Sequence, residues 1–312
     1  MSKSWLLLLG LLCSIARSAE PEWSVSRGHE RWVNSVSFSP DGKYLATASD
    51  DQSTKVWNKS SGKLHWEHSA TTAVTVVAWS ADGKQLVTGN WRGLVQVHNS
   101  SDGKLQVQWK SHRENITSLA MSSDGLLLAT ASGDDTCKIW DLATRRCLLT
   151  IDQQNEYDAT CVAFSPDQQF VVVGDGENLL KLYRISSGEL LLTFTGHAES
   201  ISAVTFTPSG KQVISSSADD SVRIWDAATG GEVRVLLGHT DDVTSLSLSG
   251  DGTRLVSGSA DRSVIVWDVA TRKKTAQFAG FANSITAVAI NADGQRVAIG
   301  TRHELRVKEV TK

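Results

Sequence analysis

Short runs of alternating apolar and polar residues recur along almost the whole chain. Val33–Phe38 and Val243–Leu248 are typical, being six residues long and rich in β-branched or other apolar side chains that alternate with serine, threonine or asparagine. Such runs predict strands with one buried face. No convincing helical pattern follows residue 18. The hydrophobic pattern therefore predicts an all-β protein.

Turn signals separate these runs at regular intervals. Most of the intervals contain an Asp-Gly or Ser-Gly pair, as in Asp41-Gly42, Asp82-Gly83 and Ser209-Gly210. Glycine adopts positive φ without steric cost, so such a pair between two apolar runs indicates a hairpin. One interval has Asp167-Gln168-Gln169 instead, and there we expect a strained or differently wound hairpin.

The strands and turns belong to one unit that is repeated seven times. Trp-Asp pairs stand at 140–141, 225–226 and 267–268, with Trp57-Asn58 as a fourth copy, and a histidine precedes each of these tryptophans by 28 residues. When the turns are aligned, the tryptophan position falls at Trp57, His98, Trp140, Tyr183, Trp225, Trp267 and Lys308. A period of 40–45 residues with this signature is typical of a four-stranded propeller blade.

The repeat resembles the WD40-repeat (WD-repeat) family over nearly all of residues 22–312. The resemblance implies an all-β, seven-bladed β-propeller of four-stranded antiparallel blades, with residues 19–312 as a single domain. The last copy supplies only three strands, so we expect Glu22–Arg27 to pair into the last blade as its outer strand. This pairing would close the ring and remove a free sheet edge.

The resemblance also implies a structural hydrogen-bond chain in the best-preserved copies. Its members would be a histidine, a hydroxyl eight residues before the tryptophan, an aspartate six before it, and the tryptophan itself. The four predicted tetrads are His29, Ser49, Asp51 and Trp57; His112, Ser132, Asp134 and Trp140; His197, Ser217, Asp219 and Trp225; His239, Ser259, Asp261 and Trp267. A catalytic interpretation is disfavoured, because the cluster recurs four times and an indole occupies its hydroxyl.

A partner-binding site is expected where the copies vary rather than where they agree. In the family, the loops that enter the first strands and those between the second and third strands most often meet partners. On this face we predict an aromatic and basic site formed by Trp32, Trp91, Arg31, Arg92, Arg113 and Arg302. Tryptophan and arginine dominate interface hot spots. Blades four to six instead present the acidic residues Glu156, Asp158, Glu199, Asp241 and Asp242.

The leading functional prediction is a non-catalytic protein–protein interaction scaffold. Its partner is unidentified, and the protein itself is expected to be monomeric or part of a hetero-complex. Two alternatives remain open: a glycan or small-ligand binding module, and a propeller hydrolase or lactonase. The innermost strands, such as Ser35–Phe38, carry small hydroxyls rather than carboxylates or imidazoles. No cofactor or metal is expected, and a net charge of −3 without a basic stripe argues against nucleic acid.

The first eighteen residues have a pattern of their own. Lys3 precedes an apolar run, Trp5–Ile15, and the small residues Ala16 and Ser18 follow it. This pattern is typical of a secretory signal peptide, and the run is too short to span a bilayer, which needs about 20 residues. We therefore expect cleavage before Ala19, export to the periplasm or the exterior, and no stable membrane insertion afterwards.

Overall fold

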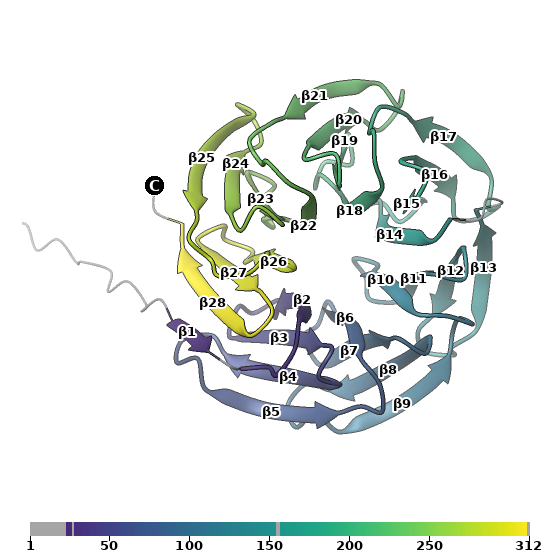
Figure 1. Ribbon diagram of the computed structural model, residues 1–312. Coiled ribbons are helices and arrows are strands. Elements are labelled where there is room, and N and C mark those ends of the chain that lie inside the picture. The colour runs from purple at the N-terminus through teal and green to yellow at the C-terminus, as the bar shows by residue number, and fades with distance from the viewer. Residues whose placement is uncertain (1–22, 27, 154–156, 311–312) are drawn as a thin grey trace, which may run out of the picture.

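The computed structural model describes residues 23–26, 28–153 and 157–310. Seven four-stranded antiparallel sheets form a closed ring, with the first strand of each blade nearest the centre (Figure 1). The prediction of a seven-bladed, all-β propeller is thus confirmed. The predicted signal peptide, residues 1–18, lies outside the described residues.

Each blade is a simple meander in which the chain runs from the inner strand to the outer one. The strands of blades one to three are β2 (Val33–Phe38), β3 (Tyr44–Ser49), β4 (Ser53–Asn58), β5 (Leu64–Ser69); β6 (Val74–Trp79), β7 (Gln85–Asn90), β8 (Leu94–Asn99), β9 (Leu105–Lys110); β10 (Ile116–Met121), β11 (Leu127–Ser132), β12 (Thr136–Asp141) and β13 (Cys147–Asp152). Those of blades four to six are β14 (Ala159–Phe164), β15 (Phe170–Asp175), β16 (Leu180–Arg184), β17 (Leu190–Phe194); β18 (Ile201–Phe206), β19 (Gln212–Ser217), β20 (Val222–Asp226), β21 (Glu232–Leu236); β22 (Val243–Leu248), β23 (Arg254–Ser259), β24 (Val264–Asp268) and β25 (Lys273–Phe278).

The seventh blade is built from both ends of the described chain. Its inner strands are β26 (Ala287–Ile290), β27 (Arg296–Gly300) and β28 (Glu304–Glu309), and its outer strand is β1 (Trp23–Ser26). β1 pairs antiparallel with β28, with Trp23 opposite Val307. In Figure 1 the purple β1 lies beside the yellow β28. The predicted closure of the ring by the N-terminal strand is confirmed.

The hydrophobic core is a ring of seven clusters among the described residues, one at each junction between neighbouring blades. At the junction of blades seven and one, for example, Val33, Leu45 and Trp57 pack against Leu305 and Val307. Because each sheet buries both faces against its neighbours, no blade has a complete core of its own.

Hydrogen bonds between the innermost strands add to this packing. The second residue of a first strand donates to the backbone of the next blade; Thr117 Oγ1, for instance, lies 2.5 Å from the Ala159 carbonyl oxygen. The same contact recurs through Asn34, Thr75, Ser202 and Thr244, and through Thr286, which directly precedes β26. At the junction of blades four and five, Thr160 Oγ1 instead contacts the Cys161 thiol at 3.7 Å.

The first hairpin of each blade follows the turn chemistry expected from the sequence. Glycine occupies its positive-φ position in six blades: Gly42, Gly83, Gly125, Gly210, Gly252 and Gly294, with φ between 66° and 74°. In blade four, Gln168 takes the same left-handed conformation, with φ of 60°. A side chain with a Cβ is strained there, so the expected irregularity is present as backbone strain rather than as a different turn.

Candidate partner-binding face

The ring has two faces, defined by the loops at the two ends of the strands. One carries the loops that enter each first strand and those between second and third strands, such as residues 28–32 and 50–52. We call it the tetrad face. The other carries the first hairpin of each blade and the turns between third and fourth strands, such as residues 39–43 and 59–63. We call it the hairpin face.

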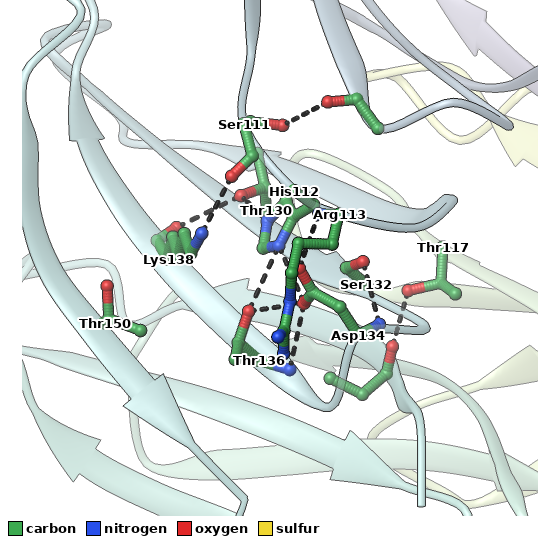
Figure 2. A network of polar contacts seen from close by, with 12 residues as sticks. Ser111, His112, Arg113, Thr117, Thr130, Ser132, Asp134, Thr136, Lys138 and Thr150 are labelled. Carbon is green, nitrogen blue, oxygen red and sulfur yellow. Dashed lines mark hydrogen bonds and ion pairs between the residues drawn. The ribbon is translucent and has the colours of Figure 1, made fainter.

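Four blades contain a complete hydrogen-bond chain below the tetrad face. In blade three, His112 Nδ1 lies 3.0 Å from Asp134 and His112 Nε2 lies 2.6 Å from the Thr130 hydroxyl (Figure 2). The Trp140 indole donates to the same hydroxyl oxygen at 3.0 Å. Blades one, five and six repeat the arrangement, with histidine–carboxylate distances of 2.8–2.9 Å. An ionised carboxylate can only accept a hydrogen bond, so the imidazole proton stands on Nδ1, and Nε2 accepts from the hydroxyl.

The prediction of the hydroxyl position was wrong. The hydroxyl is ten residues before the tryptophan, not eight, and is supplied by Thr47, Thr130, Ser215 and Ser257. The predicted residues, Ser49, Ser132, Ser217 and Ser259, instead accept the backbone amide of the aspartate two positions on, at 3.0–3.1 Å.

Strand register explains the correction. Leu45 pairs directly with Trp57 across β3 and β4. Thr47, two residues further, is the diagonal neighbour on the same sheet face and lies within reach of an indole ring. Ser49 lies another two residues along, roughly 7 Å farther at the strand rise of about 3.3 Å per residue. It therefore cannot accept the indole N–H and orients Asp51 instead.

In blades three and five, burial favours the neutral form of the tetrad histidine. Burial lowers the pKa of His112 and His197, although the neighbouring carboxylates oppose this. Burial alone would raise the pKa of Asp134, but hydrogen bonds from Thr136, the Arg113 amide and His112 outweigh it and lower the pKa to about 2. Asp219 is held at a pKa of about 2 in the same way. The tetrads are thus satisfied structural networks with no exposed nucleophile.

Blades two and four replace the tetrad by other buried contacts. In blade two, His98 stands at the tryptophan position, with its ring centroid 4.5 Å from that of His68. In blade four, Tyr183 takes the tryptophan position, and Lys181 forms a 2.9 Å ion pair with the buried Asp175.

The most exposed aromatic side chain of the tetrad face is Trp91. It is 61% exposed and lies in the turn between β7 and β8. Gly93 lets this turn approach the loop before β10, because a Cβ there would lie 2.4 Å from the carbonyl oxygens of His112 and Glu114. The His112 amide hydrogen-bonds back to Gly93, so the two loops are fixed to each other.

Three cationic side chains accompany this tryptophan. Arg92 and Arg113 are exposed, and the Lys110 ammonium donates to the Arg92 carbonyl and, at 3.3 Å, to the Arg113 carbonyl. Lys110 therefore links the two predicted loops and adds its own charge between them. We call Trp91, Arg92, Lys110 and Arg113 the Trp91 patch. Among the described residues, none of its three cations has a carboxylate in ion-pair contact.

The other predicted residues form a second, less accessible group. Trp32 is only partly exposed, and the Arg302 guanidinium lies over its ring, 5.7 Å from the centroid. Thr301 accepts the amide of Val33 at 3.1 Å, which joins this loop to blade seven. Arg31 is exposed beside them. The structure therefore places Arg302 against Trp32, and joins the backbones of Arg92 and Arg113 through Lys110.

The predicted acidic side of the face is also present. Asp220, Asp241 and Asp242 have carboxylate oxygens within 4.8 Å of one another. Burial, and then the charges of Asp241 and Asp242, raise the pKa of Asp220. Glu156 lies outside the described residues. The sequence prediction missed Lys110 and Asp220. Only their positions, at the end of a strand and in a turn, could have indicated that they belong to this face.

Comparison with known proteins agrees with this architecture. The sequence model of the family described as "WD domain, G-beta repeat" matches residues 22–58, 62–99, 103–141, 145–184, 188–226 and 230–268. This chain belongs to the WD-repeat family. Each matched segment begins with the outer strand of one blade and ends with the third strand of the next, which is the offset that ring closure requires.

Three relatives illustrate the range of similarity. The chain is 36% identical over 184 residues to Protein Notchless of Drosophila melanogaster, which covers 57% of this chain and 37% of that protein. It is 26% identical over 187 residues to U3 small nucleolar RNA-associated protein 12 of Saccharomyces cerevisiae, covering 55% and 20%. It is 28% identical over 185 residues to the Ribosome biogenesis protein WDR12 homolog of Drosophila persimilis, covering 58% and 37%. The match thus spans well under half of each relative.

The prediction of export was wrong. Two of these relatives are named for a small nucleolar RNA and for ribosome biogenesis, which contradicts a periplasmic or secreted protein. The prediction rested on Lys3, the apolar run at residues 5–15 and the small residues Ala16 and Ser18. A pattern of this kind does not by itself specify a destination. Within the described ranges, no helix is long and apolar enough to cross a membrane.

Proposed function

We propose that this WD-repeat protein is a non-catalytic scaffold that binds a protein partner through the Trp91 patch. The carrying observation is the 61% exposure of Trp91 beside three cations that lack carboxylate partners in the described chain. A tryptophan rigidly held by its backbone loses little conformational entropy on binding and offers a large contact area. Trp32 and Arg302 extend the proposed site toward blade seven.

The alternative enzyme hypothesis lacks comparable support. The tetrad hydroxyls Thr47, Thr130, Ser215 and Ser257 are fully buried. A cavity of about 340 Å³ near the ring centre is lined by apolar residues and hydroxyls such as Val36, Ser37 and Ser247. None of its lining residues is a carboxylate or an imidazole, so the groups usual in general acid–base catalysis do not surround it.

Affinity capture with matched variants tests the proposal. Trp91→Ala should reduce recovery of at least one specific protein partner by tenfold or more, and Lys110→Glu should weaken it in a salt-dependent manner. Leu237→Ala is the control, because Leu237 is 74% exposed and follows the outer strand of blade five on the same face. Equal recovery by the Trp91 and Leu237 variants, with all three proteins folded by circular dichroism, would contradict the site.

A further inference from the structure

A slot on the hairpin face separates blades four and five. It measures about 700 Å³ and is lined by the apolar residues Phe170, Leu182, Leu191, Leu192 and Phe206, with Ala227 in the neighbouring turn. A space of this size lies within the range of small-ligand pockets. The slot is at the opposite end of the strands from the Trp91 patch, so it is independent of the proposed scaffold site.

At two other blade junctions, a side chain from the outer strand fills the equivalent space. On the outer strand, Trp66 of blade one faces Val56, and Trp23 of blade seven faces Val307. Leu192 faces Leu182 at the equivalent position of blade four. The Trp66 indole crosses the junction and donates to the Ser100 carbonyl of blade two at 2.7 Å. The Trp23 indole donates likewise to the Lys59 carbonyl of blade one.

The slot between blades four and five has a backbone carbonyl equivalent to those that accept the two indole N–H groups. Lys59, Ser100 and Ala227 hold the same place in their turns. Their amides donate to Lys43, Lys84 and Lys211 respectively, at 2.9, 3.0 and 2.9 Å. The residue before each one closes the same turn with two further backbone bonds. The Ala227 carbonyl is therefore presented as the other two are, and no described residue donates to it.

The glycine of each turn gives a second comparison. A Cβ on Gly62 would lie 2.9 Å from the Trp23 indole, and one on Gly103 would lie 2.6 Å from the Trp66 indole. At Gly230 of blade five, the nearest atoms are the Thr193 carbonyl oxygen at 3.8 Å and a Phe194 carbon at 3.9 Å. All three glycines have φ between 67° and 75°. The surface that an indole covers at two junctions is thus open at the third.

We propose that the slot between blades four and five binds an indole ring, whose N–H donates to the Ala227 carbonyl while the ring packs on Gly230 and Leu192. The charged groups of the rim agree with a donor ligand. Asp167 and Asp226 face the slot with a single cation, Lys211, so negative charge predominates. Both carboxylates are fixed by turn hydrogen bonds, which leaves the slot preorganised.

Amide chemical shifts of the full chain provide the test. N-acetyl-tryptophanamide should shift the Gly230 and Ala228 amides in a saturable manner. Its N1-methyl analogue cannot donate the hydrogen bond and should bind about tenfold more weakly. Leu192→Trp should abolish binding by placing the chain's own indole in the slot, as Trp66 does at its junction. Val107→Trp is the control, because Val107 holds the equivalent position in blade two.

The proposal fails if the Leu192→Trp variant still binds the probe, or if the two probes bind equally well to the wild-type protein. The second comparison needs no variant, so it decides the matter even if Leu192→Trp does not fold. A peptide with one internal tryptophan identifies the source of the ring. Binding at least tenfold tighter than the free amide indicates a tryptophan carried by another protein, and equal binding indicates a free indole compound.

Discussion

Each complete tetrad joins four side chains whose individual hydrogen bonds are ordinary but whose burial makes them interdependent. Thr130 is the central member in blade three, since it accepts from Trp140 and donates to His112. Removing its hydroxyl leaves His112 Nε2 and Trp140 Nε1 without hydrogen-bond partners in the buried interior. An unsatisfied buried polar group lowers stability by more than one hydrogen bond adds to it.

Thr130→Val should therefore lower the free energy of unfolding by about 2–4 kcal/mol. Ser132→Ala, which removes only a bond to the Asp134 amide, should lower it by about 1 kcal/mol. Chemical denaturation of both variants measures the difference. A larger loss of unfolding free energy in Ser132→Ala than in Thr130→Val would support the hydroxyl position predicted from the sequence.

His98 gives a prediction about pH. Burial, followed by the nearby charge of His68, lowers the pKa of His98 to about 4. The unfolded chain binds this proton below about pH 6.5 while the folded protein resists it, so stability is complete above that pH and falls toward pH 4. His98→Phe should remove up to about 3 kcal/mol of this decline. Thermal melts of the wild-type protein and the variant between pH 7 and 4 measure this difference. The same pH dependence of the melting temperature in both proteins would contradict the prediction.

Part of each tetrad and part of the candidate site could be predicted from the sequence alone. The histidine, aspartate and tryptophan of each tetrad were predictable, because their spacing is the repeat itself. The hydroxyl was not, because Thr47 and Ser49 both lie on β3 and only the register with Trp57 distinguishes them. Of the candidate site, Trp91 could be predicted as exposed. The partial cover of Trp32 by Arg302 could not, because it depends on a loop of another blade.

At the scale of elements, the turns carried the most reliable information. The strands fell where alternation and Asp-Gly pairs placed them, within a residue or two. The slot between blades four and five could not be foreseen, because it depends on which outer-strand side chain crosses a junction.

Gln168 permits a direct test of turn strain. Gln168→Gly should raise the free energy of unfolding by about 0.5 kcal/mol, since relief of the left-handed conformation outweighs the loss of exposed hydrogen bonds with Ser123 and Asp124. Asp167→Gly is the comparison, because it should destabilise by removing the bond to the Ser165 hydroxyl. Urea unfolding measures both, and a destabilised Gln168 variant would argue against strain.

At the scale of the molecule, stability depends on closing the ring. β1 contributes four residues, but Trp23 and Val25 join the cluster shared by blades seven and one. Removal of the chain through residue 27 would expose the edge of β28 and one side of that cluster. We expect a melting temperature at least about 4 °C lower, together with self-association visible by light scattering. A monomeric truncated protein with an unchanged melting temperature would show that closure is dispensable.

The pairing of β1 with β28 also delays ring closure until the end of the domain has been synthesised. About 280 residues separate the two strands, so at 5–20 residues per second β1 leaves the ribosome roughly 15 to 55 s before its partner strand β28 is made. During that interval the first blade has no neighbour on one side, and Val33 and Trp57 face the solvent that blade seven later excludes. The nascent ring is thus most vulnerable at its oldest residues, and any factor that assists its folding should bind there.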